Sequence, residues 1–301
     1  MVEAAAGNGR GSSRASELIG AVLTGLAVVA VAFWTWGFAI QFLGQDANSY
    51  LAAGERLNVG HTLYGPLQPG DRAVLFGPPY WTAPLVSPPL IAVLWRPFAT
   101  PAGLVAWMIV DGAAVLAVCG YVLLKRLPLL LLVASMGVGL QLAAGNVSGF
   151  LVGGILLLWT KRDRSWVGAL LALMIGIKLL PATFLGFTAR RRQTWPWIVG
   201  GLAVSGAISL AGAGVANHLA YPSVVGGLVP YPASLGAWTG LPWLIYPVIV
   251  AGMVAGYVLP ERWAFVASLA AFVLGAPGLG LWTPLYLLAL AGPLAENSRS
   301  R

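Results

Sequence analysis

Charged residues are scarce in this chain of 301 residues: they make up only 9% of it, against 58% hydrophobic residues. Soluble domains carry about 25% charged residues, so the composition excludes an ordinary soluble fold and predicts an all-α polytopic membrane protein. Cysteine and histidine are nearly missing as well. The single cysteine, Cys119, lies inside an apolar run, which excludes an intrachain disulfide. With two histidines in all, the chain has no Cys/His cluster with zinc spacing, and we predict no metal ligands.

Several catalytic motifs are also missing. The sequence has no phosphate-binding glycine loop, dinucleotide fingerprint or serine nucleophile motif. Its net charge of +8 would suit a nucleic-acid partner, but the basic residues occur in short clusters between apolar runs, as in the cytoplasmic loops of membrane proteins. We therefore expect membrane lipids, and no nucleic acid, as partners. The clusters are Lys125-Arg126, 161–164, 190–192, Arg262 and 299–301.

The ends of the chain predict its orientation. Residues 1–16 are rich in Gly, Ser and Ala and predict a disordered cytoplasmic tail, and 297–301 form a second cytoplasmic tail. Between them, 17–296 make a single transmembrane domain. The apolar run 18–43 is too long for a signal peptide and is a retained helix. Arg10 and Arg14 place the N-terminus in the cytoplasm of a multi-pass plasma-membrane protein.

The apolar runs predict a bundle of about nine to eleven transmembrane or re-entrant helices. After the first, they lie near 87–99, 101–124, 127–143, 147–160, 165–189, 196–216, 241–259, 262–275 and 279–294. The runs 87–99 and 147–160 are shorter than the about 20 residues of a spanning helix. If every basic cluster is cytoplasmic, then 87–99 or one neighbour does not span fully. Two loops, about 44–86 and 217–240, are extracytoplasmic.

A carboxylate begins the first of these loops. A surface helix over 46–57, at about 100° per residue, places Asp46, Tyr50, Ala53 and Leu57 on one face and Glu55 on the opposite one. A carboxylate on the apolar face of such a helix is costly unless it is used, which makes Asp46 a catalytic candidate. The alternative is that Asp46 serves as the N-cap of this helix.

A few polar residues lie inside the apolar runs. Asp111 lies in the run 101–124, and Lys178 lies in 165–189 just before Pro181. Each is a functional candidate because charge in hydrocarbon is costly; the alternatives are a polar contact between helices for Asp111 and snorkelling to the interface for Lys178. Asn146 and Ser148 lie in a break flanked by glycines, where they either cap the next helix or face a site.

Further candidates lie in the two loops. Arg56, His61, Arg72 and His218 are cations that an anionic ligand would need, although a lone loop cation is usually only solvated. Tyr64 and the other loop aromatics are typical of an interfacial belt. Together with Asp46, these residues indicate one site at one membrane face.

These residues also carry a resemblance. Asp46-x3-Tyr50-x2-Ala53-x6-Gly60-x2-Leu63-Tyr64, then Pro88-Pro89-Leu90, then Lys178-x2-Pro181 before an arginine-rich loop, resembles the GT-C-fold, polyprenol-phosphate-mannose-dependent mannosyltransferases of actinobacteria. The resemblance runs from the first helix to about Arg192. Three features differ from that family: Ser87 replaces the usual tyrosine before the two prolines, Gly145-Asn146-Val147-Ser148 replaces Gly-Gln-x-Asn, and the chain is shorter.

The resemblance implies an inverting glycosyltransferase with a GT-C-like bundle. Asp46 would be its general base, and a sugar, mannose by analogy, would pass from a polyprenyl-phosphate donor to a lipid or glycolipid acceptor on the extracytoplasmic side. The leaving phosphate needs cations, for which the candidates are Lys178, Arg56, Arg72 and His218. Tyr50, Tyr64, His61 and Asn146 are the expected substrate contacts. No cofactor is expected, and a divalent metal is unnecessary if these cations suffice.

Two other functions stay open from the sequence. Asp111, Lys178 and the broken helices also suit a transporter or flippase for a lipid-linked sugar or a small solute, in which Asp111 would be the sensitive residue. The altered motifs and the short C-terminal half also suit a non-catalytic scaffold subunit, which would tolerate loss of the Asp46 carboxylate.

Overall fold

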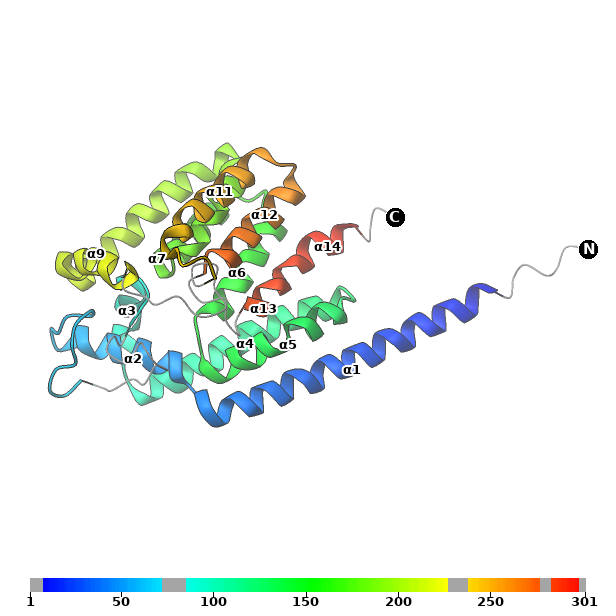
Figure 1. The fold of residues 1–301 in the computed structure, drawn as a ribbon, viewed down its shortest axis with the longest axis horizontal. Helices are drawn as coiled ribbons and strands as arrows, with labels where there is room; N and C mark the ends of the chain where they lie inside the picture. Colours follow the sequence, from blue (N-terminus) through cyan, green and yellow to red (C-terminus); the bar gives the residue numbers. More distant parts are fainter. Residues whose placement is uncertain (1–7, 72–84, 227–237, 277–282, 298–301) are drawn as a thin grey trace, which may run out of the picture.

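The structure is a computed structural model in which every described regular element is helical. It describes residues 8–71, 85–226, 238–276 and 283–297. The all-α prediction is confirmed for these parts of the chain. Three described helical stretches are long and apolar enough to cross a membrane, namely Ala15–Phe42, Pro101–Leu124 and Arg192–Val225. Shorter apolar helices pack with them in one bundle (Figure 1).

The first helix, α1 (Asn8–Phe42), lies along one side of the bundle (Figure 1). It begins at Asn8, so residues 8–16, which we predicted to be a disordered tail, are helical; residues 1–7 lie outside the described part. It packs parallel to α5 (Pro128–Ala144): a Cβ added at Gly139 would lie 2.5 Å from Cβ of Trp34. The Gly44 amide donates to the carbonyl of Ala143 over 2.7 Å where α1 ends.

The helix predicted over 46–57 is confirmed as α2 (Gln45–Asn58), which is largely buried against the bundle. Its N-cap is Gly44, whose φ of 63° is one that glycine adopts readily. No side chain caps this helix, so the alternative role of Asp46 as an N-cap is wrong. Asp46 lies in the first turn, partly buried.

The short run 87–99 folds as α3 (Pro89–Trp95) and the 3-10 helix η1 (Arg96–Phe98). Seven helical residues rise only about 10 Å. A Cβ at Gly54 of α2 would meet the backbone of Trp95 at 3.1 Å, and Arg96 donates to the carbonyl of Gly212 over 3.1 Å. Both ends of the segment therefore stay at the end of the bundle that holds α2, and this run does not traverse it.

The middle of the chain follows the predicted runs closely. It contains α4 (Pro101–Leu124), α6 (Ser148–Thr160), α7 (Val167–Ile177), η2 (Leu180–Phe184), α8 (Leu185–Ala189) and η3 (Arg192–Thr194). Gly145, with φ of 66°, ends α5. Extended backbone at Lys178 ends α7, and Pro181 follows in η2. The two breaks that the sequence predicts are thus confirmed.

The C-terminal half contains α9 (Trp195–Gly226), η4 (Pro242–Leu244), α11 (Ile245–Val258), α12 (Glu261–Leu274), α13 (Thr283–Tyr286), η5 (Leu287–Leu290) and α14 (Ala291–Asn297). Helix α9 is interrupted at Gly214, with φ 76° and ψ 161°. Asn217 and His218 contact the carbonyls of Ala213 and Gly214 with their side chains, at 2.7 and 2.8 Å. Residues 217–226, which we predicted to be loop, are therefore helical.

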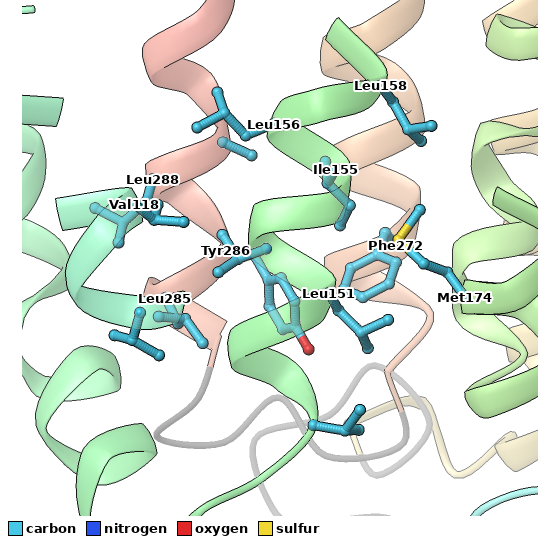
Figure 2. Packing of buried hydrophobic residues seen from close by; sticks show 14 of the residues in the cluster. Val118, Leu151, Ile155, Leu156, Leu158, Met174, Phe272, Leu285, Tyr286 and Leu288 are labelled. Carbon is cyan, nitrogen blue, oxygen red and sulfur yellow. The ribbon is translucent and has the colours of Figure 1, made fainter. Parts of the chain in front are cut away.

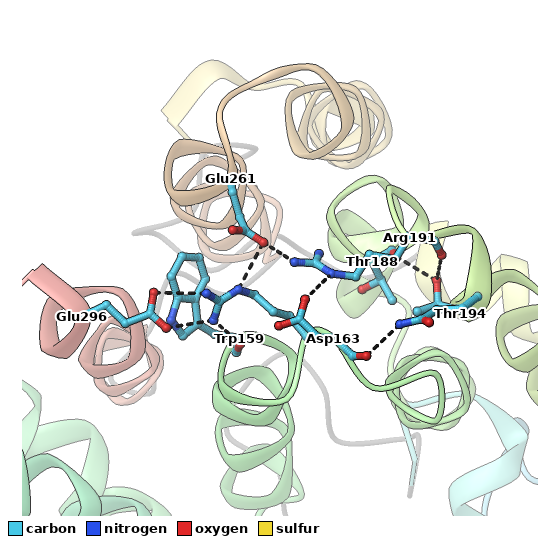
Figure 3. A network of polar contacts seen from close by, with 9 residues as sticks. Trp159, Asp163, Thr188, Arg191, Thr194, Glu261 and Glu296 are labelled. Atoms are coloured by element: carbon cyan, nitrogen blue, oxygen red, sulfur yellow. Dashed lines mark hydrogen bonds and ion pairs between the residues drawn. The ribbon is translucent and has the colours of Figure 1, made fainter.

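One end of the bundle carries an ionic network, which we call the basic end (residues 161–164, 190–192, Glu261 and Glu296; Figure 3). Arg162 contacts Glu261 at 3.1 Å and Glu296 at 2.8 Å. Arg191 contacts Asp163 at 3.0 Å and also pairs with Glu261. The loops after α6 and α8, the start of α12 and the end of α14 thus meet here.

The apolar core lies between the helices that connect the two ends. Figure 2 shows side chains of α4, α6, α7 and α12 and of the C-terminal helices interdigitating around Tyr286. The Tyr286 ring meets that of Phe272 edge-on, with centroids 4.5 Å apart. This contact packs α13 against α12 and places Tyr286 of the C-terminal half in the centre of the bundle.

Candidate functional site

The end opposite the basic end is the site end (Asp46, the turn 145–148 and Lys178). Oδ2 of Asp46 accepts a hydrogen bond from Nδ2 of Asn146 over 3.0 Å. Burial raises the pKa of the Asp46 carboxyl above its ordinary value, while the Asn146 hydrogen bond and then the Lys178 charge oppose that rise. A raised pKa brings this carboxylate closer to the pKa that suits a general base at neutral pH.

The Asn146 carboxamide is the centre of the cluster. Its Oδ1 accepts from Nζ of Lys178 over 3.2 Å, and from the amide and hydroxyl of Ser148 over 2.9 and 2.7 Å. The same side chain that donates to the carboxylate thus accepts from the ammonium. Asp46, Asn146 and Lys178 are each partly exposed, whereas Ser148 is buried.

Local backbone breaks bring these three groups together from distant parts of the chain. Asp46 belongs to the first turn of α2, directly after the Gly44 turn. Asn146 follows Gly145, whose left-handed conformation ends α5 and lets α6 begin three residues later, at Ser148. Lys178 lies where α7 ends in extended backbone. Each polar side chain is therefore placed at a helix terminus.

The turn 145–148 is held by contacts from three helices. The indole N–H of Trp107 on α4 donates to the carbonyl of Gly145 over 2.7 Å. The amide of Val147 donates to the Tyr50 hydroxyl of α2 over 3.3 Å. Nε2 of Gln141 on α5 donates to the carbonyl of Asn146.

Aromatic rings and the C-terminal half complete the surroundings. Trp107 lies 6.0 Å from Tyr50 and 5.2 Å from Phe150, measured between ring centroids. Tyr286 is hydrogen-bonded with Ser148, which links α13 to the Asn146 contacts. Tyr286, Trp107 and Gln141 were not predicted as site residues from the sequence. An isolated Tyr, Trp or Gln within an apolar run carries no spacing signal that would have found them.

The predicted loop cations Arg56 and His61 lie in a separate cluster with Asp71. The Arg56 side chain is 1% exposed; it donates to the carbonyls of Thr62 and Pro66, and its Nη1 forms an ion pair with Oδ2 of Asp71 at 3.0 Å. His61 contacts the other carboxylate oxygen at 2.9 Å. The structure gives Arg56 and His61 partners within their own loop, and their roles toward substrate stay predictions.

The other predicted loop residues are also placed away from the Asn146 contacts. The Tyr64 hydroxyl donates to the carbonyl of Ser87 over 2.5 Å, and its ring packs 5.6 Å from that of Tyr221. His218 contacts Ser209 at 2.9 Å on α9. Arg72 lies outside the described residues. Of the predicted site residues, the structure thus brings together Asp46, Tyr50, Asn146 and Lys178, with Tyr50 buried beneath the turn.

The arrangement joins a proton acceptor to a cation with free donor capacity. A lysine ammonium has three donor hydrogens, of which Asn146 takes one here. Carboxylate and ammonium side by side suit deprotonation of a hydroxyl next to an anionic group. Over the described residues, no three His, Cys, Asp or Glu side chains group as metal ligands would. Comparison with protein-family models, with curated proteins and with solved structures found no match to this chain.

Proposed function

We propose that this chain is an integral membrane glycosyltransferase that moves a sugar, mannose by the resemblance, from a polyprenyl-phosphate donor to a lipid or glycolipid acceptor. The observation that carries the proposal is the convergence of Asp46, Asn146 and Lys178 at one end of the bundle. The sequence motifs of the resemblance contain two of these residues, and the fold supplies a reason for their pattern. Asp46, Asn146 and Lys178 are far apart in the sequence, and only the fold brings them into contact.

The proposed reaction is a direct inverting displacement. The acceptor hydroxyl attacks the anomeric carbon, the carbon–oxygen bond to the phosphate breaks, and its electron pair leaves with the phosphate. Asp46 takes the proton of the attacking hydroxyl, a contribution of about 10²–10⁴ in rate. Lys178 stabilises the charge that develops on the phosphate. The Asn146 carboxamide holds base and cation in register.

Membrane orientation forms part of the proposal. The basic clusters 161–164 and 190–192 meet in the ionic network of the basic end (Figure 3), as expected when loops on that side are cytoplasmic. We propose that the basic end lies in the cytoplasm and that the site end faces the extracytoplasmic side of the plasma membrane. Because α3 stays at the site end, α1 and α4 run between the two ends in opposite directions, which supports the prediction that 87–99 does not span the membrane when every basic cluster is cytoplasmic.

The testing experiment measures transfer of label from radiolabelled polyprenyl-phosphate mannose to lipid acceptors in membranes that contain the chain. Wild type is compared with Asp46→Asn and with Glu55→Gln, a matched loss of charge on the opposite face of the same helix. We expect transfer by wild type and Glu55→Gln, and a loss of about 10²–10⁴ in Asp46→Asn. Equal transfer by all three chains would sink the base assignment. No transfer by wild type from mannose, arabinose or glucose donors would refute the proposed function.

A transporter or flippase is the second candidate, and one observation favours it. Asp111 is 1% exposed, and its Oδ1 has no hydrogen-bond partner among the described residues. A buried carboxylate of this kind is typical of ion-coupled transport. The transporter predicts substrate movement without a new glycosidic bond, and loss of movement in Asp111→Asn with Asp46→Asn unaffected. The scaffold alternative predicts that neither substitution matters.

A further inference from the structure

A buried polar pair, Asp111 and Gln141, adjoins the turn 145–148. Nε2 of Gln141 on α5 donates to Oδ2 of Asp111 on α4 over 2.8 Å, and it also donates to the carbonyl of Asn146. Gln141 is 0% exposed and Asp111 is 1% exposed. The Gln141 amide thus connects a carboxyl inside the bundle to the backbone of the residue that contacts Asp46.

The surroundings of this pair fix it tightly. A Cβ added at Gly149 of α6 would lie 2.5 Å from Oδ1 of Asp111, so the glycine lets the α6 backbone approach the carboxyl directly. Among the described residues, Oδ1 of Asp111 and Oε1 of Gln141 have no hydrogen-bond partner. Burial of such acceptors is costly, and apolar residues of similar size would often stabilise a fold more. Stabilisation of the core therefore does not explain why Asp111 and Gln141 are buried here.

We propose that Asp111 and Gln141 are positioning residues, which act on the site by holding the backbone of Asn146 so that its carboxamide bridges Asp46 and Lys178. Gln141 has one amide group with two donor hydrogens; the bond to Asp111 fixes its rotation and directs the other donor at the Asn146 carbonyl. Trp107 and Tyr50 hold the neighbouring residues Gly145 and Val147. The Asn146 carbonyl also accepts from the Gly149 amide of α6 over 3.3 Å, so Gln141 supplies the anchor that ties Asn146 to α5 and, through Asp111, to α4.

The kinetic part of this inference rests on the proposed transferase, and the structural part does not. The variants are Gln141→Met, which keeps the size and removes the donor, Asp111→Leu, which removes the acceptor, and Asp111→Asn, which keeps an acceptor for Gln141. We expect kcat to fall about 10–100-fold in Gln141→Met and Asp111→Leu. Donor KM stays within about threefold, and Asp111→Asn keeps most of the activity.

An assay of local order tests the same inference without catalysis. Cys119, the only cysteine of the chain, is replaced by alanine, and a single cysteine is placed at Val147 in the turn or at Val152 one turn deeper in α6. Both valines are buried, at 1% and 0% exposure. We expect Gln141→Met and Asp111→Leu to raise the thiol labelling rate at position 147 by at least about tenfold through local opening, with position 152 still protected and Asp111→Asn unchanged.

Each outcome decides the matter. Unchanged labelling at position 147 in Gln141→Met would overturn the proposal. A rise at both cysteines would also overturn it, because the pair would then stabilise the bundle in general. If Asp111→Asn lost activity as fully as Asp111→Leu, the carboxyl itself would be required and a positioning role would be wrong. If wild type transfers no sugar, the transferase fails while labelling still decides whether Asp111 and Gln141 anchor the turn.

Discussion

The Asn146→Leu substitution tests the electrostatic link between the turn and the proposed base. It removes the donor that lies 3.0 Å from Oδ2 of Asp46 while keeping the side-chain size. A hydrogen bond to a charged group contributes about 1.5–3 kcal/mol, and one pKa unit corresponds to about 1.36 kcal/mol. Because burial already raises the pKa of Asp46 and this bond opposes the rise, its loss should raise the pKa of Asp46 further.

The assay is the pH dependence of kcat/KM for sugar transfer. A general base must be ionised, so activity falls on the acid side as pH drops through the pKa of Asp46. In wild type this acid limb should lie above the ordinary aspartate value of about 3.9, and in Asn146→Leu it should move toward higher pH. A uniform loss of rate with an unmoved acid limb would refute the reasoning, since Asn146 would then act on something other than the carboxylate.

Ser148→Ala is the matched control for that experiment. The Ser148 hydroxyl donates to Oδ1 of Asn146 over 2.7 Å. Its removal leaves the contact between Nδ2 of Asn146 and Asp46 in place. The acid limb of kcat/KM should therefore stay close to its wild-type position. A shift as large as that of Asn146→Leu would mean that the carboxamide orientation, and not its donor, sets the pKa.

The remaining predictions concern stability, measured by thermal unfolding in detergent. Burial raises the pKa of Asp71, but the effects of the Gln68 amide, His61 and Arg56 outweigh burial, so the net shift of this pKa is downward. The stabilisation from the ionised carboxylate is therefore present at neutral pH and is lost as pH falls through its folded pKa, below about 3.9. Asp71→Asn should cost about 3–5 kcal/mol at neutral pH, and no loss would refute the stabilising role of the Arg56–Asp71 ion pair. Gly139→Val should lower the unfolding temperature by pushing α1 from α5, because even an added Cβ would lie 2.5 Å from Cβ of Trp34. The control Gly25→Val should leave the unfolding temperature unchanged, because an added Cβ there meets nothing within 4 Å. Glu261→Gln should lower the unfolding temperature at low salt and less at high salt; a loss that is independent of salt would contradict the role of the ionic network.

Helix positions could be predicted because their signals are local. Apolar runs, Pro101 and Pro128 at helix starts and the glycine after α5 each act on nearby backbone, so α4 and α5 end within about one or two residues of their expected bounds. Where long-range contacts decide, local signals fail. Residues 217–226 carry a proline, yet they are helical after the Gly214 break, and Asn217 there accepts from the Leu63 amide over 2.8 Å.

The candidate site was only partly predictable for the same reason. Asp46 and Lys178 stand out because charge next to apolar runs is costly wherever the chain folds. Their partner Asn146 has no such signal, and its contact with Asp46 joins residues 100 positions apart. Asp111 was a candidate for its charge, but its link to Asn146 passes through Gln141, which is an ordinary residue in the sequence. Tyr286 reaches Ser148 only because the C-terminal helices pack into the centre of the bundle.

The bridging carboxamide gives the site a property that a direct ion pair would not have. In the described part of the chain no ion pair joins Asp46 to Lys178, and the Lys178 charge lowers the pKa of Asp46 less than the Asn146 hydrogen bond does. A lysine in direct contact would hold the carboxylate ionised and make it a weaker base. With the amide between them, burial dominates and the pKa of Asp46 stays raised, while the ammonium keeps donors for an anionic group. In the proposed transferase, base and cation would therefore serve one reaction without neutralising each other.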